Sequence, residues 1–334
     1  MRILVTGAAG FIGAHLTKRL VEAGHQVAGI DNFNDYYDVR LKRDRVLHLL
    51  SNQVKIYEVD ISDSDSVGHI FDIEAPEVVV NLAAQAGVRH SLSHPHEYIK
   101  SNVNGFLSIL EACRHNKVSH LIYASSSSVY GANGTPVFST KDNVDHPLSL
   151  YAATKKADEL MAHTYSHLYH IPTTGLRFFT VYGPWGRPDM ALFKFTERMI
   201  DRKPVDVYNF GRMRRDFTFV GDIVEAVSRL VELPPKSSSE WNSERPDPST
   251  SFAPYRIFNI GSNRPVALMD FIYEIEKNLG LESEKNYMDL QPGDVISTHA
   301  DVSDLYQVTQ YKPETKIEDG IRAFIEWYRK YYGK

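Results

Sequence analysis

Hydrophobic positions along the first part of the chain alternate between short runs and longer periodic stretches. Short runs rich in β-branched residues predict strands at 3–5, 27–30, 55–58, 77–81, 120–125 and 173–179. Between them, apolar residues recur at helical spacing over 12–23, 41–50, 97–115 and 151–169. Strands that alternate with helices in this way predict a doubly wound parallel sheet with helices on both faces.

This alternation stops after Gly183, and the elements become shorter and more mixed. The pattern predicts a strand at 256–260 and helices at 191–202, 221–233, 268–279 and 317–331. We therefore expect the parallel sheet in residues 1–183 and a smaller α/β domain mainly in residues 184–334, with some crossing of the chain. Residues 234–254 contain five prolines and six serines, so we expect a solvated, mobile loop outside any active site.

Composition and charge narrow the classes of function. The 334 residues are 43% hydrophobic, which is enough for a substantial core. A formal net charge of -5 argues against a nucleic-acid or anionic membrane surface, because such surfaces need clustered Lys and Arg. A strand already begins at Arg2, and no apolar run is long enough to cross a bilayer, so we expect a cytoplasmic protein. The single cysteine, Cys113, lies in a helical pattern and is expected in the core.

A glycine-rich segment at 7–13 follows the first predicted strand and begins the first predicted helix. Its glycines let backbone amides and the helix N-terminus approach a pyrophosphate closely. Asp31 ends the next strand, where a carboxylate can accept hydrogen bonds from both ribose hydroxyls and repel a 2′-phosphate. The pattern predicts NAD, in preference to NADP, as the cofactor.

Polar residues after a later strand are candidates for the catalytic groups at the same edge of the sheet as the glycine-rich segment. Four serines at 125–128 follow the strand at 120–125, where their hydroxyls would face the cleft. Tyr151 and Lys155 are four residues apart at a helix start and therefore share one face. A nearby ammonium lowers the pKa of a phenol and so provides a base near neutral pH. Each feature alone is also consistent with a linker or a surface helix.

The order and spacing of these motifs resemble the extended short-chain dehydrogenase/reductase superfamily, which contains NAD-dependent epimerases and dehydratases on a Rossmann sheet. The segments 82–89, 175–190 and 214–218 resemble UDP-glucuronate 4-epimerases in particular. The resemblance implies a catalytic triad of Ser126, Tyr151 and Lys155, in which Ser126 binds the reacting sugar hydroxyl. It implies an NAD site made of Gly7, Gly10, Phe11, Ile12, Gly13, Asp31, Asn32, Asp60, Ile61, Leu82, Ala83, Ala84, Tyr151 and Lys155.

The same resemblance implies interconversion of UDP-glucuronate and UDP-galacturonate through a 4-keto intermediate. Arg215 is expected at the diphosphate, and Phe193 and residues 205–208 are expected at the uridine. The sugar carboxylate is expected to bind neutral hydroxyls and Arg187. The implied substrate-binding residues are Arg89, Ser126, Ser127, Ser128, Tyr151, Thr180, Arg187, Met190, Phe193, Val205, Tyr208, Arg215 and Asp294.

Several alternatives stay open. UDP-glucose 4-epimerases carry Asn where Thr180 stands and often Arg before the Gly-Asp that ends at Asp294. UDP-glucuronate decarboxylases typically carry Glu at the position of Ser128, and 4,6-dehydratases need an Asp-Glu pair at positions 127–128. A non-catalytic NAD sensor would have lost the catalytic tyrosine or lysine.

A homodimer is also implied by the resemblance, with the helices at 97–115 and 151–169 pairing with their symmetry mates. Phe106, Leu110 and Leu160 are candidate apolar contacts, although the spacing could equally place them in the core. We expect no metal.

Overall fold

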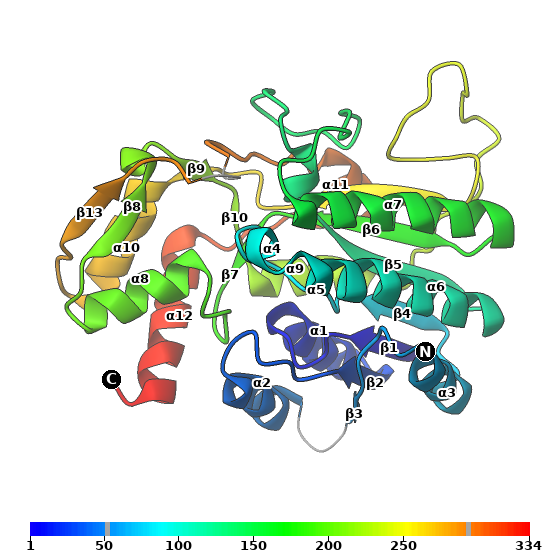
Figure 1. The fold of residues 1–334 in the computed structure, drawn as a ribbon, viewed down its shortest axis with the longest axis horizontal. Helices are drawn as coiled ribbons and strands as arrows, with labels where there is room; N and C mark the ends of the chain where they lie inside the picture. Colours follow the sequence, from blue (N-terminus) through cyan, green and yellow to red (C-terminus); the bar gives the residue numbers. More distant parts are fainter. Residues whose placement is uncertain (51–53, 292–294) are drawn as a thin grey trace.

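A parallel sheet of seven strands forms the centre of the computed structural model, which describes residues 1–50, 54–291 and 295–334 (Figure 1). Its strand order is β11-β6-β5-β4-β1-β2-β3, and every neighbouring pair is parallel. The strands are β1 (Arg2–Thr6), β2 (Gln26–Asp31), β3 (Lys55–Glu58), β4 (Val78–Asn81), β5 (His120–Ser126), β6 (Thr173–Phe178) and β11 (Tyr255–Ile260). The predicted doubly wound sheet is confirmed.

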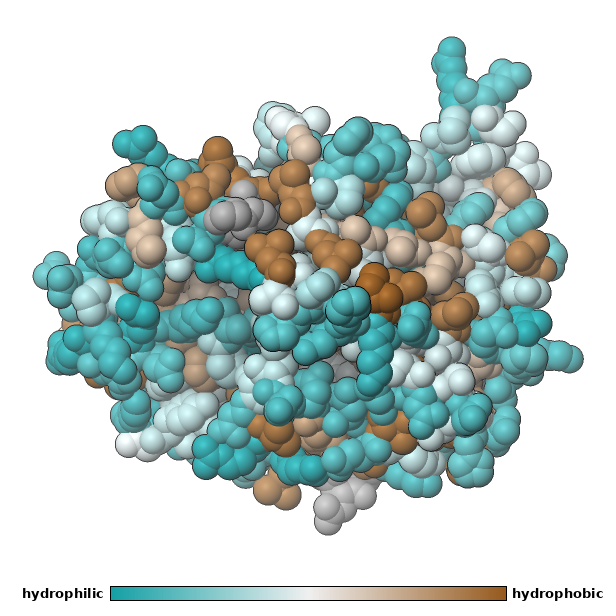
Figure 2. All heavy atoms as spheres, in the orientation of Figure 1, coloured by the Kyte–Doolittle hydropathy of each residue, from teal (hydrophilic) through white to brown (hydrophobic). Residues whose placement is uncertain are grey.

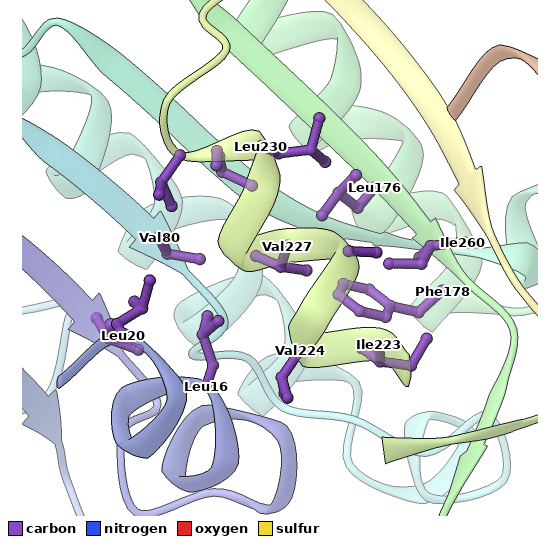
Figure 3. Packing of buried hydrophobic residues seen from close by; sticks show 14 of the residues in the cluster. Leu16, Leu20, Val80, Leu176, Phe178, Ile223, Val224, Val227, Leu230 and Ile260 are labelled. Atoms are coloured by element: carbon purple, nitrogen blue, oxygen red, sulfur yellow. The ribbon is translucent and has the colours of Figure 1, made fainter. Parts of the chain in front are cut away.

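Helices cover both faces of this sheet because its strands are apolar on both sides. One face packs against α1 (Phe11–Glu22), α9 (Val220–Leu230) and α11 (Ser303–Thr309). Figure 3 shows Leu16 and Leu20 of α1 and Val227 of α9 in this layer. The other face packs against α3 (Ser64–Glu74), α6 (Gly105–His115) and α7 (Leu150–Tyr169).

A smaller domain lies beside the sheet and is built around an aromatic core. Its helices are α8 (Ala191–Ile200), α10 (Leu268–Leu279) and α12 (Ile317–Tyr332). The rings of Phe217 and Phe271 stack there with their centroids 4.0 Å apart. Three short strand pairs complete it: β7 (Thr180–Tyr182) with β10 (Phe217–Phe219), β8 (Val205–Tyr208) with β13 (Lys285–Met288), and β9 (Arg214–Arg215) with β12 (Val266–Ala267).

The remaining helical segments lie in connections between these elements. They are α2 (Val39–Arg45) and the turn Val46–Leu50, α4 (His90–Ser93), α5 (Pro95–Tyr98), and the turns Ile99–Asn104, Ser127–Tyr130 and Asn209–Gly211. Among the described residues, no helix combines the length and the apolar character needed to cross a membrane.

The chain returns from the smaller domain to the sheet. The strand near 256–260 is β11, an edge strand of the central sheet, where Tyr255 pairs with Thr173 and Ile260 with Phe178. Helix α9 likewise packs on α1 and the sheet, because Ile223 and Val227 are fully buried in that layer. The loop at 234–254 joins these two elements and projects away from α8 and α10 (Figure 1).

A buried ion pair fixes α7 to the sheet. Arg177 of β6 donates from Nε and Nη2 to the two carboxylate oxygens of Glu159 on α7, at 2.8 and 3.0 Å. Ser125 donates to the same carboxylate at 2.7 Å, and Arg177 also donates to the hydroxyl of Tyr130 at 3.1 Å. Both charged side chains are almost fully buried. Loss of one partner from such a pair costs about 3–5 kcal/mol, so this contact holds α7 firmly in place.

Candidate active site

A cleft of about 650 Å³ lies where the carboxyl ends of the central strands meet the smaller domain. Its wall includes Gly7 after β1, Leu82 after β4 and Ser126 at the end of β5. The opposite wall includes Tyr208 of β8 and Phe217 of β10. This is the position where open parallel sheets bind their ligands.

The glycine segment forms a close backbone cradle at one side of the cleft. Gly7 has φ +67°, and a Cβ there would lie 2.9 Å from the backbone nitrogen of Ala83. A Cβ on Gly13 would lie 2.0 Å from the carbonyl oxygen of Gly7. Helix α1 starts after Gly10 with no side-chain cap and no acidic residue in its first turn. The free helix N-terminus and the tight turn therefore suit the pyrophosphate of NAD.

Asp31 is fixed at the end of β2 beside this cradle. Its carboxylate accepts hydrogen bonds from the backbone nitrogens of Ala9, at 3.0 Å, and Phe33, at 2.9 Å. Burial raises the pKa of Asp31, while these amides and the cations Lys42 and Arg45 act in the opposite direction. The carboxylate lines the cleft where the ribose of NAD was expected.

The neighbouring part of the wall is formed by Asn32 after β2 and by Asp60 and Ile61 in the loop after β3. Asp60 accepts hydrogen bonds from Ser62 at 2.9 and 2.8 Å and from Lys100 at 3.2 Å. Burial favours the neutral acid, but these bonds outweigh it and lower the pKa of Asp60. The loop is therefore held in place by a charged, fully engaged carboxylate.

Ser126, Tyr151 and Lys155 all lie on the cleft wall. Ser149 caps the N-terminus of α7 with its side chain, so the helix begins where Tyr151 can face the cleft. Ser126 accepts a hydrogen bond from the backbone nitrogen of Ser128 and donates to its hydroxyl, both at 3.2 Å. The structure thus brings a hydroxyl, a phenol and an ammonium to one edge of the sheet.

Arg187 is held in a fixed orientation on the same cleft. Its Nε and Nη2 donate to the two carboxylate oxygens of Asp189, at 2.9 and 2.5 Å, and Tyr36 donates to Asp189 at 3.2 Å. Burial disfavours the arginine charge, but Asp189 outweighs it and raises the pKa of Arg187. Burial and the Asp189 charge raise the pKa of Tyr36 to about 12, so its phenol remains a donor.

The expected substrate residues lie largely on the cleft wall. The guanidinium of Arg89 lies 4.6 Å from the ring centre of Tyr208, so the two halves of the cleft are in contact there. The expected residues that line the cleft are Arg89, Ser126, Ser127, Ser128, Tyr151, Thr180, Arg187, Met190, Tyr208 and Arg215.

Two of the residues expected at the uridine, Phe193 and Val205, have side chains buried in the core of the smaller domain and do not line the cleft. Side chains alternate along β8, so Val205 points inward while Asp206 lines the cleft. On α8 the face with Phe193 packs against α12, and Phe195 lines the cleft instead. Asp294 lies outside the described residues.

Sequence reasoning missed several residues after β2 that line the cleft, including Asn34 and Tyr36 in the loop and Lys42 on α2. Lys42 donates to the backbone oxygen and to the side-chain oxygen of Asn34, both at 2.6 Å. Burial lowers the pKa of Lys42 to about 8. The only signal was the pair of tyrosines at 36 and 37 after the ribose carboxylate, because Lys42 itself resembles a solvent-facing helix residue.

Comparisons with known proteins agree with this geometry. Residues 3–261 match the family described as "NAD dependent epimerase/dehydratase family". The chain is 59% identical to Protein CapI of Staphylococcus aureus over the whole of both chains. It is 46% identical to a probable UDP-glucuronate 4-epimerase of Rhizobium meliloti, covering 99% of this chain and 98% of that one. A structure of UDP-glucuronic acid 4-epimerase from Bacillus cereus with UDP-glucuronic acid and NAD matches with a TM-score of 0.88 and 33% identity, over 99% and 100% of the two chains.

Replacing Asp31 by alanine is expected to weaken NAD binding about ten- to a hundredfold, since a hydrogen bond to a charged group contributes about 1.5–3 kcal/mol. The preference for NAD over NADP should also fall, because the charge that repels a 2′-phosphate is lost. Calorimetric titration of the cofactor-free protein with both dinucleotides measures the two effects. Asp72→Asn, an exposed change on α3, is the control. An unchanged ratio of the two affinities would remove Asp31 from the ribose site.

Proposed function

Because the chain belongs to the NAD dependent epimerase/dehydratase family, we propose that it is a UDP-glucuronate 4-epimerase that interconverts UDP-glucuronate and UDP-galacturonate. The arrangement that carries this proposal is the cleft itself, where Ser126, Tyr151 and Lys155 lie beside the dinucleotide cradle, with Thr180 and Arg187 on the same wall. The substrate of the Bacillus cereus enzyme and the activity of the Rhizobium meliloti relative support the same substrate class.

The reaction needs a base at the 4-hydroxyl of the sugar. The glycine cradle and Asp31 would hold NAD, which would supply the redox chemistry that carbon 4 needs. The Lys155 ammonium stabilises Tyr151 as a phenolate, and this phenolate removes the proton from the 4-hydroxyl and becomes a neutral phenol. Ser126 holds the 4-oxygen. In the second half of the reaction Tyr151 gives the proton back to the same oxygen.

Inversion requires the 4-keto sugar to turn and present its opposite face. We assign the nucleotide to the smaller domain, mainly residues 184–334, where Tyr208 and Arg215 line the cleft. Arg215 donates to the backbone oxygens of Arg214 and Ile296, which fixes its guanidinium beside the expected diphosphate. A nucleotide held there leaves the sugar free to rotate about its diphosphate bonds, while residues 1–183 hold NAD.

The carboxylate makes this reaction chemically demanding. Oxidation at carbon 4 creates a β-keto acid, which loses carbon dioxide readily. The hydroxyls of Ser127, Ser128 and Thr180 line the cleft together with Arg187. Fixed donors of this kind can hold the carboxylate charged, with its carbon–carbon bond out of alignment with the carbonyl π system. Asp189 contributes by keeping Arg187 in one orientation.

The alternatives fit this cleft less well. A decarboxylase would carry Glu at the position of Ser128, where a second negative charge would repel the substrate carboxylate. The sugar of a UDP-glucose 4-epimerase has no carboxylate to bind the hydroxyls of Ser127, Ser128 and Thr180. A non-catalytic NAD sensor would not need Tyr151 and Lys155 on the cleft wall.

Tyr151→Phe is expected to lower epimerisation about 10²–10⁴-fold, because only the proton-transferring oxygen is lost. NAD binding and folding should stay close to wild type. Chromatography of reactions with UDP-glucuronate and with UDP-glucose measures turnover and substrate preference together. Wild-type turnover by the variant would contradict the catalytic assignment, and a wild-type preference for UDP-glucose would contradict the substrate.

Thr180→Ala and Arg187→Ala are expected to raise the KM for UDP-glucuronate or to let a UDP-pentose appear, because each loses a donor to the carboxylate. Wild type should form almost no UDP-pentose. Mass-resolved chromatography of the products separates the two effects. Arg322→Ala, which removes an exposed arginine on α12, is the matched control for Arg187→Ala. If both variants process the acid normally and without pentose, its carboxylate binds elsewhere.

A homodimer is the assembly that we propose, through α6 and α7. Phe106 and Leu110 belong to the core and are at most 1% exposed, which corrects their expected place in the interface. Leu107, Leu160 and Leu168 are 42%, 58% and 56% exposed instead. Figure 2 shows hydrophobic side chains gathered over these helices. Exposed apolar side chains that gather in one region are typical of an interaction surface.

Light scattering is expected to give twice the monomer mass for the wild-type protein. The double change Leu107→Glu and Leu160→Glu should give a monomer, because it places four charges in the symmetric interface. Leu47→Glu, an equally drastic change at an exposed leucine in the turn Val46–Leu50, should leave the mass unchanged. A monomeric wild type, or a dimer that survives the double change, would contradict this interface.

A further inference from the structure

A buried carboxylate that the mechanism above does not use lies directly behind the catalytic lysine. The Nζ of Lys155 donates to Oδ2 of Asp158 at 3.0 Å, and both side chains are 2% exposed. The other oxygen, Oδ1, has no hydrogen-bond partner among the described residues. Burial of a charged carboxylate with a single ionic partner is costly, so this position calls for a functional reason.

Other ionisable groups around Asp158 do not replace Lys155 as its partner. Glu159, next on α7, directs its carboxylate to Arg177 of β6. The phenols of Tyr123 on β5 and Tyr255 on β11 lie in the same buried layer, and burial raises the pKa of both. Both phenols are therefore neutral near pH 7. The charges nearest to Asp158 are those of Lys155 and Glu159.

Helical geometry places Asp158 in line with the catalytic phenol. Tyr151, Lys155 and Asp158 are at positions i, i+4 and i+7 of α7 and therefore share one face. Seven residues of helix separate the first from the last by about 10 Å. At this separation a buried negative charge acts on the phenolate as well as on the ammonium.

We propose that Asp158 is a positioning residue that holds the Lys155 ammonium and limits how strongly that ammonium stabilises the Tyr151 phenolate. When Asp158 is charged, the Lys155–Asp158 pair is nearly neutral overall, and Lys155 stabilises the Tyr151 phenolate less. With Asp158 neutral, the full positive charge of Lys155 favours the phenolate. This inference rests on the proposed roles of Tyr151 and Lys155, and it does not depend on which sugar the enzyme accepts.

The charge of Asp158 changes near neutral pH. Burial raises the pKa of Asp158 to about 7, against the lowering effect of Lys155. As the pH rises through this value, Asp158 gains its charge and opposes the ionisation of Tyr151. A neutral residue at 158 removes that opposition, so the phenolate should form at lower pH.

Asp158→Asn tests this through the pH dependence of turnover. The acid limb of the kcat profile is expected to move to lower pH by up to about one unit. This is the Coulomb interaction of two charges about 10 Å apart at an effective dielectric constant near 20, and it applies in full where Asp158 is charged. Asp158→Ser should shift the limb in the same direction and serves if the first variant does not fold. Asp158→Glu, which keeps the charge, should leave the limb near its wild-type position.

Three controls separate the possible causes. Asp72→Asn makes the same change of net charge at an exposed site on α3 and should not move the limb. NAD content and circular dichroism report whether each variant is folded. The pH profiles are measured with whichever UDP-sugar the wild-type enzyme converts, so an error in the proposed substrate does not affect this test. Turnover by Tyr151→Phe would show instead that Tyr151 is not the base. A limb that stays in place, or moves to higher pH, in folded neutral variants would overturn the role of Asp158.

Discussion

The buried pair of Glu159 and Arg177 is the contact on which the geometry of the cleft depends. It joins the helix that carries Tyr151 and Lys155 to the strand beside β5, and Ser125 of β5 binds the same carboxylate. The pair is acceptable in the core because both carboxylate oxygens and three guanidinium nitrogens have partners. One polar network thereby holds together the helix that carries Tyr151 and the strand that carries Ser126, through Glu159, one turn beyond Lys155, and Ser125, the residue before Ser126.

The parallel sheet adds a second constraint, since it brings the ends of β1, β2, β4 and β5 to a single edge. The glycine cradle, Asp31 and Ser126 meet there although they are far apart in the sequence. The smaller domain closes the same edge from the other side. Its contacts with the sheet domain, such as Tyr36 with Asp189 and Arg89 with Tyr208, cross the cleft where the sugar nucleotide is proposed to bind.

Features set by local sequence could be predicted, and features set by long-range packing could not. The strand–glycine–helix unit at 7–13 and the Tyr151–Lys155 pair depend on residues close in sequence, and both lie on the cleft. The faces of Phe193 and Val205 depend on how the smaller domain packs, and their burial could not be derived from spacing. The burial of Asp158 could not be predicted either, because an acidic residue in an amphipathic helix normally faces water.

The central claim is that inversion occurs by transient oxidation at carbon 4, with no exchange of that hydrogen with water. The direct test uses UDP-glucuronate labelled with deuterium at carbon 4, followed by NMR of the UDP-galacturonate formed. The account predicts that the product retains the deuterium at carbon 4, and that unlabelled substrate takes up none at that carbon in heavy water. Loss of the label to solvent, or its uptake from heavy water at carbon 4, would contradict the account.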